Sequence, residues 1–220
     1  MPNSLTAPPV RPLLDRLFQA AYADDTHWAA IRERHPDGFA GLTAREQADA
    51  YAELYIPVSP EGGRLLYTLV RASRPATVVE FGTSFGISTI HLAAAVTDNG
   101  SGRVVTTELS DRKATAARQN LEQAGLAGVV TILQGDALET LASVTGPVGL
   151  VLLDGWKELY LPVLRLLQPR LTPGALVIAD DTSYESAAGY LTHVRDLGSG
   201  FVSVDFPVDD GIEVSCWTSR

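Results

Sequence analysis

The stretch that decides the fold is residues 78–88, which read Val-Val-Glu-Phe-Gly-Thr-Ser-Phe-Gly-Ile-Ser. Its valines and first phenylalanine are typical of a buried strand, and Gly82 and Gly86 let the backbone approach a ligand where a Cβ would collide. Apolar residues then recur at helical spacing from Ser88 to Val96. We therefore predict a strand, a glycine turn and a helix whose unpaired N–H groups face a binding pocket.

The glycine spacing distinguishes between nucleotide ligands. Dinucleotide-binding loops have the pattern G-x-G-x-x-G, whereas this chain has Glu80-x-Gly82-x-x-x-Gly86. The spacing disfavours a pyrophosphate, and with it a nicotinamide oxidoreductase. The loop resembles the S-adenosylmethionine-binding loop of Rossmann-like methyltransferases. The alternative from the residues alone is an ordinary βα turn that binds no ligand.

Composition narrows the range of functions. A chain of 220 residues suits one α/β domain. The formal charge of −9 and the pI near 4.8 disfavour a nucleic-acid partner and favour a small or neutral substrate. The lone Cys216 suits a reducing cytoplasm and is interpreted as a small hydrophobic residue in a late strand. Since no apolar run approaches the ~20 residues of a membrane span, we expect a soluble, cytoplasmic protein.

Four helices are predicted before the central stretch. The first covers residues 13–23, and the second is a short helix that contains Trp28 and Ile31 and ends before Pro36. The third covers residues 43–54 and begins with a capping box. The fourth begins at Pro60 and stops at Pro75. The proline-rich residues 2–12 are expected to be mobile. The sequence leaves open whether these helices cover the site or join two subunits of a homodimer, and we expect some of both.

After the central stretch, strands and helices alternate. Strands are predicted at residues 104–107, 129–133, 148–153 and 175–179, with helices at 110–124, 137–144 and 184–197. Residues 201–206 and 212–217 form a final hairpin around an Asp-Gly turn. An antiparallel hairpin appended to five βα units differs from the plain dinucleotide-binding plan.

Two acidic residues after these strands have two interpretations each. Glu108 ends the second strand, where a carboxylate accepts hydrogen bonds from ribose hydroxyls, or it stabilises the helix that follows through the helix dipole. Asp136 follows the third strand, where it could hold the amine of an adenine or cap the next helix. Both roles of Asp136 can hold at once.

Three aspartates follow the next two strands, Asp154 after one and Asp180 and Asp181 after the other. Neighbouring carboxylates repel one another unless a positive charge lies between them. A divalent cation such as Mg²⁺, which prefers oxygen ligands, would resolve that repulsion. The alternative is an acidic rim in water, and the sequence favours the metal.

With these residues in place, the chain resembles the catechol O-methyltransferase-like family of S-adenosylmethionine-dependent enzymes over roughly residues 56–218. The matching stretches are residues 80–88, Ala124-Gly-Leu, Val130-Thr-Ile-Leu-x-Gly135, Leu153-Asp-x-Trp-Lys-x-x-Tyr-Leu-Pro162, Ala179-Asp-Asp181 and the turn at Gly211. The resemblance implies an α/β, Rossmann-like methyltransferase fold. Its sheet would have seven mostly parallel strands and a C-terminal antiparallel hairpin. Residues 1–220 would form one domain, with a helical extension over 1–55 and the core over 56–220.

The resemblance also implies residue roles. Cofactor-binding positions fall on Val58, Glu80, Gly82, Ser84, Gly86, Ser88, Glu108, Asp136, Ala137, Asp154 and Trp156; metal-binding positions fall on Asp154, Asp180 and Asp181; the general base falls on Lys157. A cation lowers the pKa of an acceptor hydroxyl, and we expect Lys157, its own pKa depressed by the cation and by burial, to take the proton. The alternative is a solvated lysine that pairs with Glu158 or Asp154 and has no catalytic role.

Two positions depart from the family pattern. The family usually has Asn where this chain has Asp181. The acidic residue that grips the second hydroxyl of a catechol falls on Val204. The leading hypothesis is a divalent-metal-dependent O-methyltransferase with S-adenosylmethionine and Mg²⁺ as cofactors and a small hydroxylated, aromatic acceptor. The alternatives are N-methylation or non-aromatic O-methylation of a secondary metabolite, and a non-catalytic S-adenosylmethionine-binding protein.

Overall fold

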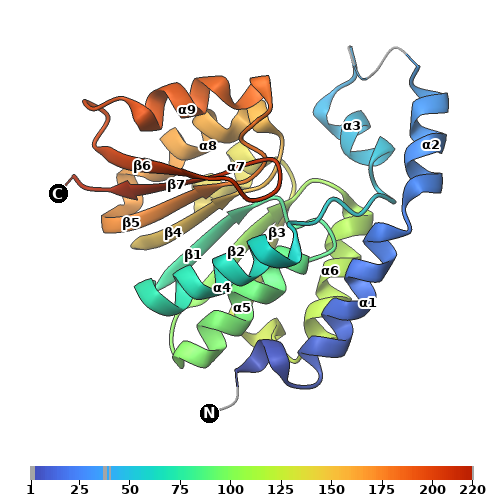
Figure 1. Cartoon of the computed structure of the whole chain (residues 1–220), viewed down its shortest axis with the longest axis horizontal. Coiled ribbons are helices and arrows are strands. Elements are labelled where there is room, and N and C mark those ends of the chain that lie inside the picture. The colour runs from blue at the N-terminus through green and yellow to red at the C-terminus, as the bar shows by residue number, and fades with distance from the viewer. Residues whose placement is uncertain (1–2, 37–38, 40, 220) are drawn as a thin grey trace.

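A single sheet of seven strands forms the centre of the computed structural model, which describes residues 3–36, 39 and 41–219 (Figure 1). The strands are β1 (Thr77–Phe81), β2 (Arg103–Glu108), β3 (Val130–Gln134), β4 (Val148–Leu153), β5 (Leu171–Ala179), β6 (Phe201–Phe206) and β7 (Ile212–Trp217). Their spatial order is β3-β2-β1-β4-β5-β7-β6. Strands β1 to β5 are parallel, and β7 runs antiparallel to both β5 and β6. The predicted Rossmann-like methyltransferase fold with its antiparallel hairpin is confirmed.

Helices cover both faces of the sheet. The helices are α1 (Val10–Tyr22), α2 (Asp25–Arg34), α3 (Ala44–Ala50), α4 (Pro60–Ser73), α5 (Ile87–Asn99), α6 (Asp111–Gln123), α7 (Ala137–Thr140), α8 (Tyr160–Leu167) and α9 (Ala188–Arg195). Val78 packs into the core under α1, α4, α5 and α6, while Val79 packs into a second core under α7, α8 and α9. Because successive strand residues point to opposite faces, β1 supplies both cores, which explains why every one of its residues is buried.

Several predicted boundaries shift in the structure; for example, the helix predicted over 137–144 is α7 over Ala137–Thr140 followed by a 3₁₀ turn. The capping box of Thr43 and Glu46 opens α3 as expected, but α3 ends at Ala50 instead of residue 54. The helix predicted over 184–197 is a 3₁₀ turn followed by the shorter α9, and β5 begins at Leu171, before its predicted start.

The expectation of a mobile N-terminal segment is wrong for its described residues. Asp98 at the end of α5 accepts hydrogen bonds from the Ser4 backbone N–H at 2.9 Å and from the Tyr67 hydroxyl at 2.6 Å. Val10, which begins α1, is buried. Proline content predicted mobility, but a carboxylate far along the chain fixes this segment, and sequence spacing could not reveal that contact.

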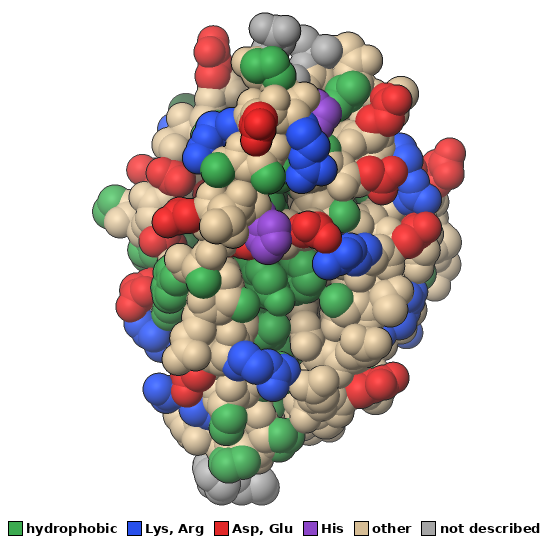
Figure 2. Space-filling view, turned by 90° about the vertical axis from the view of Figure 1, so that its right-hand side faces the viewer, with side chains coloured by type: hydrophobic (Ala, Val, Ile, Leu, Met, Phe, Trp, Pro, Cys, Tyr) green, Lys and Arg blue, Asp and Glu red, His purple; other side chains and the backbone are tan. Residues whose placement is uncertain are grey.

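Figure 2 shows the face that carries α1 and α2, where acidic and basic side chains are interspersed around a central apolar patch. Tyr22 at the end of α1 leaves 70% of its surface exposed. The homodimer through the N-terminal helices stays a prediction. Within the described ranges, the helices are too short or too polar to span a bilayer.

The close approach of β1 and β4 makes Gly82 intolerant of a side chain. Its φ is +102°, and a Cβ there would collide with the carbonyl oxygen of Asp154. We expect Gly82→Ala to lower the free energy of unfolding by about 3 kcal/mol, measured by urea denaturation. Gly100→Ala is the matched control, because Gly100 also has a positive φ (+70°) but has open space around it. It should cost only about 1 kcal/mol, and equal losses for the two variants would contradict the collision.

Candidate active site

A pocket of about 350 Å³ lies at the carboxyl ends of the parallel strands, the edge at which open α/β sheets bind ligands. Nine sequence-predicted residues line it: Gly82, Ser84, Glu108, Asp136, Ala137, Asp154, Trp156, Lys157 and Asp181. They follow five different strands, from β1 to β5. The parallel register places these strand ends side by side, so the loops converge on one pocket.

Four predicted cofactor residues lie behind this lining instead: Val58, Glu80, Gly86 and Ser88. Glu80 is fully buried and accepts hydrogen bonds from the hydroxyls of Ser88 at 2.6 Å and Thr89 at 2.5 Å. Burial raises the pKa of Glu80 to about 7, although these hydrogen bonds oppose the rise. Glu80 thus ties β1 to the first turn of α5, and its direct contact with a cofactor stays a prediction.

Glu108 is held in place by the two loops that it joins. One carboxylate oxygen accepts the backbone N–H of Ser84 and the other that of Ser110, both at 2.8 Å. Ser110, and not Glu108, caps helix α6. Because each carboxylate oxygen can accept more than one hydrogen bond, Glu108 can still accept ribose hydroxyls. Both interpretations of Glu108, the ribose contact and the helix dipole, stay predictions.

We expect Glu108→Gln to weaken the binding of S-adenosylhomocysteine by roughly 10-fold to 100-fold, because hydrogen bonds to a charged acceptor contribute about 1.5–3 kcal/mol each. Titration calorimetry measures the change. Glu158→Gln is the matched control, since Glu158 lines the same pocket and loses the same charge. An affinity of Glu108→Gln within twofold of the unchanged protein would rule out the ribose contact.

Asp136 shows its capping role directly. Its side chain accepts the backbone N–H of Leu138 at 2.7 Å and caps α7. It also lines the pocket beside Ala137, so the adenine contact is sterically open to it and stays a prediction.

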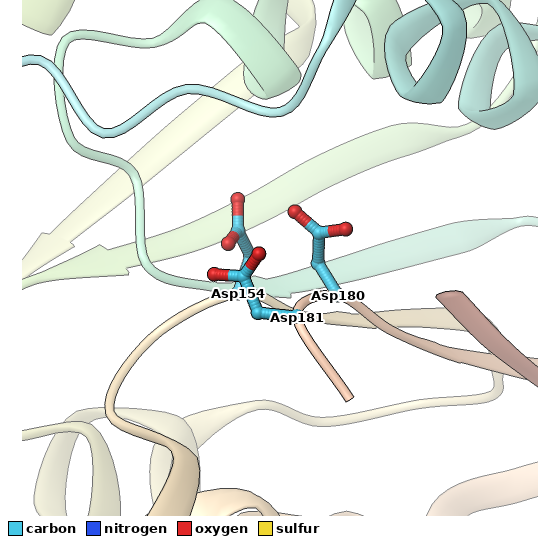
Figure 3. Close-up of side chains that lie close together, drawn as sticks. All are labelled: Asp154, Asp180 and Asp181. Carbon is cyan, nitrogen blue, oxygen red and sulfur yellow. The ribbon is translucent and has the colours of Figure 1, made fainter. Parts of the chain in front are cut away.

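The three aspartates come together at the ends of β4 and β5. Leu153 pairs with Ala179 in the parallel register, so Asp154 and Asp180 emerge next to each other. One carboxylate oxygen from each of Asp154, Asp180 and Asp181 lies within 4.8 Å of the others. Figure 3 shows the three side chains rising from these strand ends into a shared space.

The electrostatics of this cluster are those of a cation site. Burial, followed by the charges of neighbouring aspartates, raises the pKa of Asp180 to about 7 and that of Asp154 well above its usual value. Closely spaced oxygen ligands with excess negative charge are the donor set that a hard divalent cation prefers. The residues present therefore fit a Mg²⁺-type ion.

Lys157 lies against the same cluster. Its Nζ is 2.9 Å from Asp181 Oδ2 and 4.0 Å from Asp154 Oδ1. Burial opposes its charge, but the carboxylates of Asp154 and Asp181 together outweigh burial and raise the pKa of Lys157. The expected depression of the Lys157 pKa presupposes a bound cation and stays a prediction; without the cation, the neighbouring carboxylates raise this pKa.

The N-terminal helices supply pocket residues that sequence reasoning did not single out. Trp28 of α2, Ala48 of α3 and Tyr51 line the pocket. The Tyr51 ring lies 5.9 Å from Trp28 and 5.4 Å from Trp156, centroid to centroid. Trp28 and Tyr51 of the N-terminal extension thus form an aromatic wall of the pocket together with Trp156. Helical spacing placed Trp28 on a helix but could not show which way it points.

Lys113 was also missed. It is buried, lines the pocket and lies over the Phe85 ring at 5.8 Å from the centroid. One signal could have found it: the chain has only two lysines, Lys113 and Lys157, among its 17 basic residues, and both line this pocket.

Comparisons with known proteins agree with this geometry. Residues 79–182 match the family described as Methyltransferase domain. The catechol O-methyltransferase of Sus scrofa is 30% identical over 148 residues, which are 64% of this chain and 78% of that protein. The catechol O-methyltransferase of Mycobacterium tuberculosis is 37% identical over 142 residues, which are 64% of each protein.

A solved structure extends the likeness to the whole core. Cofactor-bound Rv0187 from MTB superposes with a TM-score of 0.69 at 28% identity, covering 86% of this chain and 97% of that one. The match spans 58% of the catechol O-methyltransferase of Niastella koreensis and 64% of the M. tuberculosis one, less than two thirds of either. The fold, the pocket and these relatives together show that the chain belongs to the catechol O-methyltransferase-like family of S-adenosylmethionine-dependent O-methyltransferases.

Proposed function

We propose that this protein transfers a methyl group from S-adenosylmethionine to a hydroxyl of a small aromatic molecule with the help of a divalent cation. The observation that carries the proposal is that one pocket is lined by Glu108, by Lys157 and by Asp154 and Asp181, two members of an aspartate cluster that fits a cation. A binding protein would need the first of these but has no use for the other two.

The cofactor would lie along the loops after β1, β2 and β3. S-adenosylmethionine supplies an electrophilic methyl group on a sulfonium. Glu108 would accept the ribose hydroxyls, Asp136 and Ala137 would border the adenine, and Trp156 would pack against the cofactor. Asp154 would hold the positive end, because its carboxylate lines the pocket and attracts a sulfonium or ammonium.

The aspartate cluster would hold the cation. A divalent cation in that place supplies positive charge that lowers the pKa of a nearby hydroxyl. Asp154, Asp180 and Asp181 would contribute oxygen ligands from the ends of β4 and β5, and their fixed positions would help to orient the acceptor for in-line displacement.

Lys157 would accept the acceptor's proton at Nζ. Its Nζ borders both the cluster and the pocket, so a hydroxyl presented there is within its reach. The carboxylates that raise the pKa of Lys157 keep it protonated in the cation-free protein. Lys157 would therefore act as a base only when a bound cation offsets the negative charge of these carboxylates.

The aromatic wall of Trp28, Tyr51 and Trp156 favours a planar acceptor, since aromatic rings stack or meet edge to face. Val204 leaves 52% of its surface exposed on β6 and is not part of the pocket lining. The acidic grip on a second hydroxyl is therefore missing at that position, and the proposal extends to aromatic molecules with a single hydroxyl.

The test is mass spectrometry of products after incubation with S-adenosylmethionine, Mg²⁺ and a panel of catechols, simple phenols, sugars and amines. O-methylated aromatic products are expected, with phenols accepted alongside catechols. Products methylated only on amines or sugars would replace the proposed acceptor class. S-adenosylmethionine binding by calorimetry without any product would reduce the protein to a binding function.

A further inference from the structure

Lys157 contacts the aspartate cluster directly. Its side chain is 17% exposed, and its nearest carboxylate oxygen, on Asp181, is 2.9 Å from Nζ. The Asp154 carboxylate is the next, at 4.0 Å. The ammonium also lies over the Tyr160 ring, 5.4 Å from the centroid. The ammonium therefore lies near two carboxylates that are proposed to bind the cation and near one aromatic ring.

A cation at this cluster and the Lys157 ammonium would share the carboxylates of Asp154 and Asp181. Three carboxylate oxygens, one from each of Asp154, Asp180 and Asp181, lie within 4.8 Å of one another. Mg²⁺ binds its oxygens at about 2.1 Å, so an ion among them approaches Asp181 closely. A cation at this carboxylate would therefore repel the Lys157 ammonium that contacts it. The two positive charges would be close together, and water screens charges weakly in a partly buried site.

We propose that in the cation-free protein the ammonium of Lys157 takes the place of the divalent cation at Asp181 and Asp154, so that the cation binds only by displacing the lysine. The inference rests on the proposed metal site and adds a built-in competitor to it. The ammonium then offsets part of the negative charge of the cluster when no cation is bound. Displacement at the same time frees Lys157 from its partner and delivers it to the pocket beside the acceptor.

Asp181 is the residue on which the exchange depends. Its φ of +53° is left-handed, a conformation that Asp and Asn both adopt. Asp181→Asn therefore keeps the backbone and the shape of the side chain while it removes the charge that pairs with Lys157. This makes it a clean partner for a double-mutant cycle with Lys157→Gln.

The first measurement is Mg²⁺ affinity by titration calorimetry for the unchanged protein, Lys157→Gln, Asp181→Asn and the double variant. We expect Lys157→Gln to bind Mg²⁺ roughly tenfold more tightly, because the competing charge is gone. In the Asp181→Asn background the same change should have a clearly smaller effect. Lys113→Gln is the matched control: it removes the other lysine from the same pocket and should change the affinity less than Lys157→Gln does.

The second measurement observes the displacement itself. Because the chain has two lysines, protein labelled with ¹³C at the lysine ε-carbon gives two side-chain signals, and Lys157→Gln identifies them. Saturation with Mg²⁺ should move the Lys157 signal strongly and leave the Lys113 signal nearly in place.

The outcomes separate the two ideas. An unmoved Lys157 signal at saturating Mg²⁺, or an affinity of Lys157→Gln within twofold of the unchanged protein, would overturn the competition while leaving the metal site intact. An effect of Lys157→Gln that is equal in both backgrounds would replace displacement with simple repulsion and would also overturn it. Failure of every variant to bind Mg²⁺ would overturn the metal site and the competition together.

Discussion

Removal of divalent cations should abolish methyl transfer, and added Mg²⁺ should restore it. The acceptor hydroxyl has to lose its proton near neutral pH, and Lys157 alone cannot take it while Asp154 and Asp181 raise the pKa of the lysine. Under the proposed mechanism, removal of the cation would leave the acceptor hydroxyl protonated and Lys157 as an ammonium. The measurement is S-adenosylhomocysteine formation with the best acceptor of the panel, in excess EDTA and after Mg²⁺ is added back.

Cofactor binding provides the control for this experiment. Glu108, Asp136 and Ala137 lie at the ends of β2 and β3, whereas the aspartates follow β4 and β5, and of these only Asp154 is also assigned to the cofactor. We therefore expect EDTA to leave the affinity for S-adenosylhomocysteine nearly unchanged. Full turnover in excess EDTA would remove the metal from the mechanism.

Replacement of Lys157 by Gln should lower kcat by about 10²-fold to 10⁴-fold, the usual contribution of a general base, even though the same change should tighten Mg²⁺ binding. Opposite effects on cation affinity and on turnover separate catalysis from folding or metal loss. Steady-state kinetics at saturating Mg²⁺ measures kcat.

Lys157→Arg distinguishes the base from an ion-pairing residue. Arginine can keep the contact with Asp181 but does not give up its proton. If Lys157 is the base, Lys157→Arg should be nearly as inactive as Lys157→Gln. Activity of the arginine variant near that of the unchanged protein would show that only the positive charge matters.

Much of the fold could be predicted from local sequence patterns, because a strand that is buried on both faces of a sheet is rich in apolar residues. The apolar run of β4 and the glycine turn after β1 fix a parallel sheet, and the Asp-Gly turn fixes the hairpin of β6 and β7. The ends of elements were less predictable. The helix after Thr43 continues in pattern to residue 54 but ends at Ala50, where the chain turns towards the pocket.

The site was predictable where strand order alone places a residue. Asp154, Asp180 and Asp181 meet because β4 and β5 pair in register. Side chains whose role depends on distant packing were not predictable. Glu80 accepts hydrogen bonds from Ser88 and Thr89, and the ammonium of Lys157 lies 2.9 Å from Asp181, which follows another strand.

The most direct test of the account is whether a cation bound at the aspartate cluster lies beside the transferable methyl group. S-adenosylmethionine labelled with ¹³C in that methyl, bound to the protein with Mn²⁺ in place of Mg²⁺, reports their proximity through paramagnetic broadening. The account predicts strong broadening of the methyl signal that is lost in Asp180→Asn. A sharp methyl signal from bound cofactor while Mn²⁺ is also bound would contradict it.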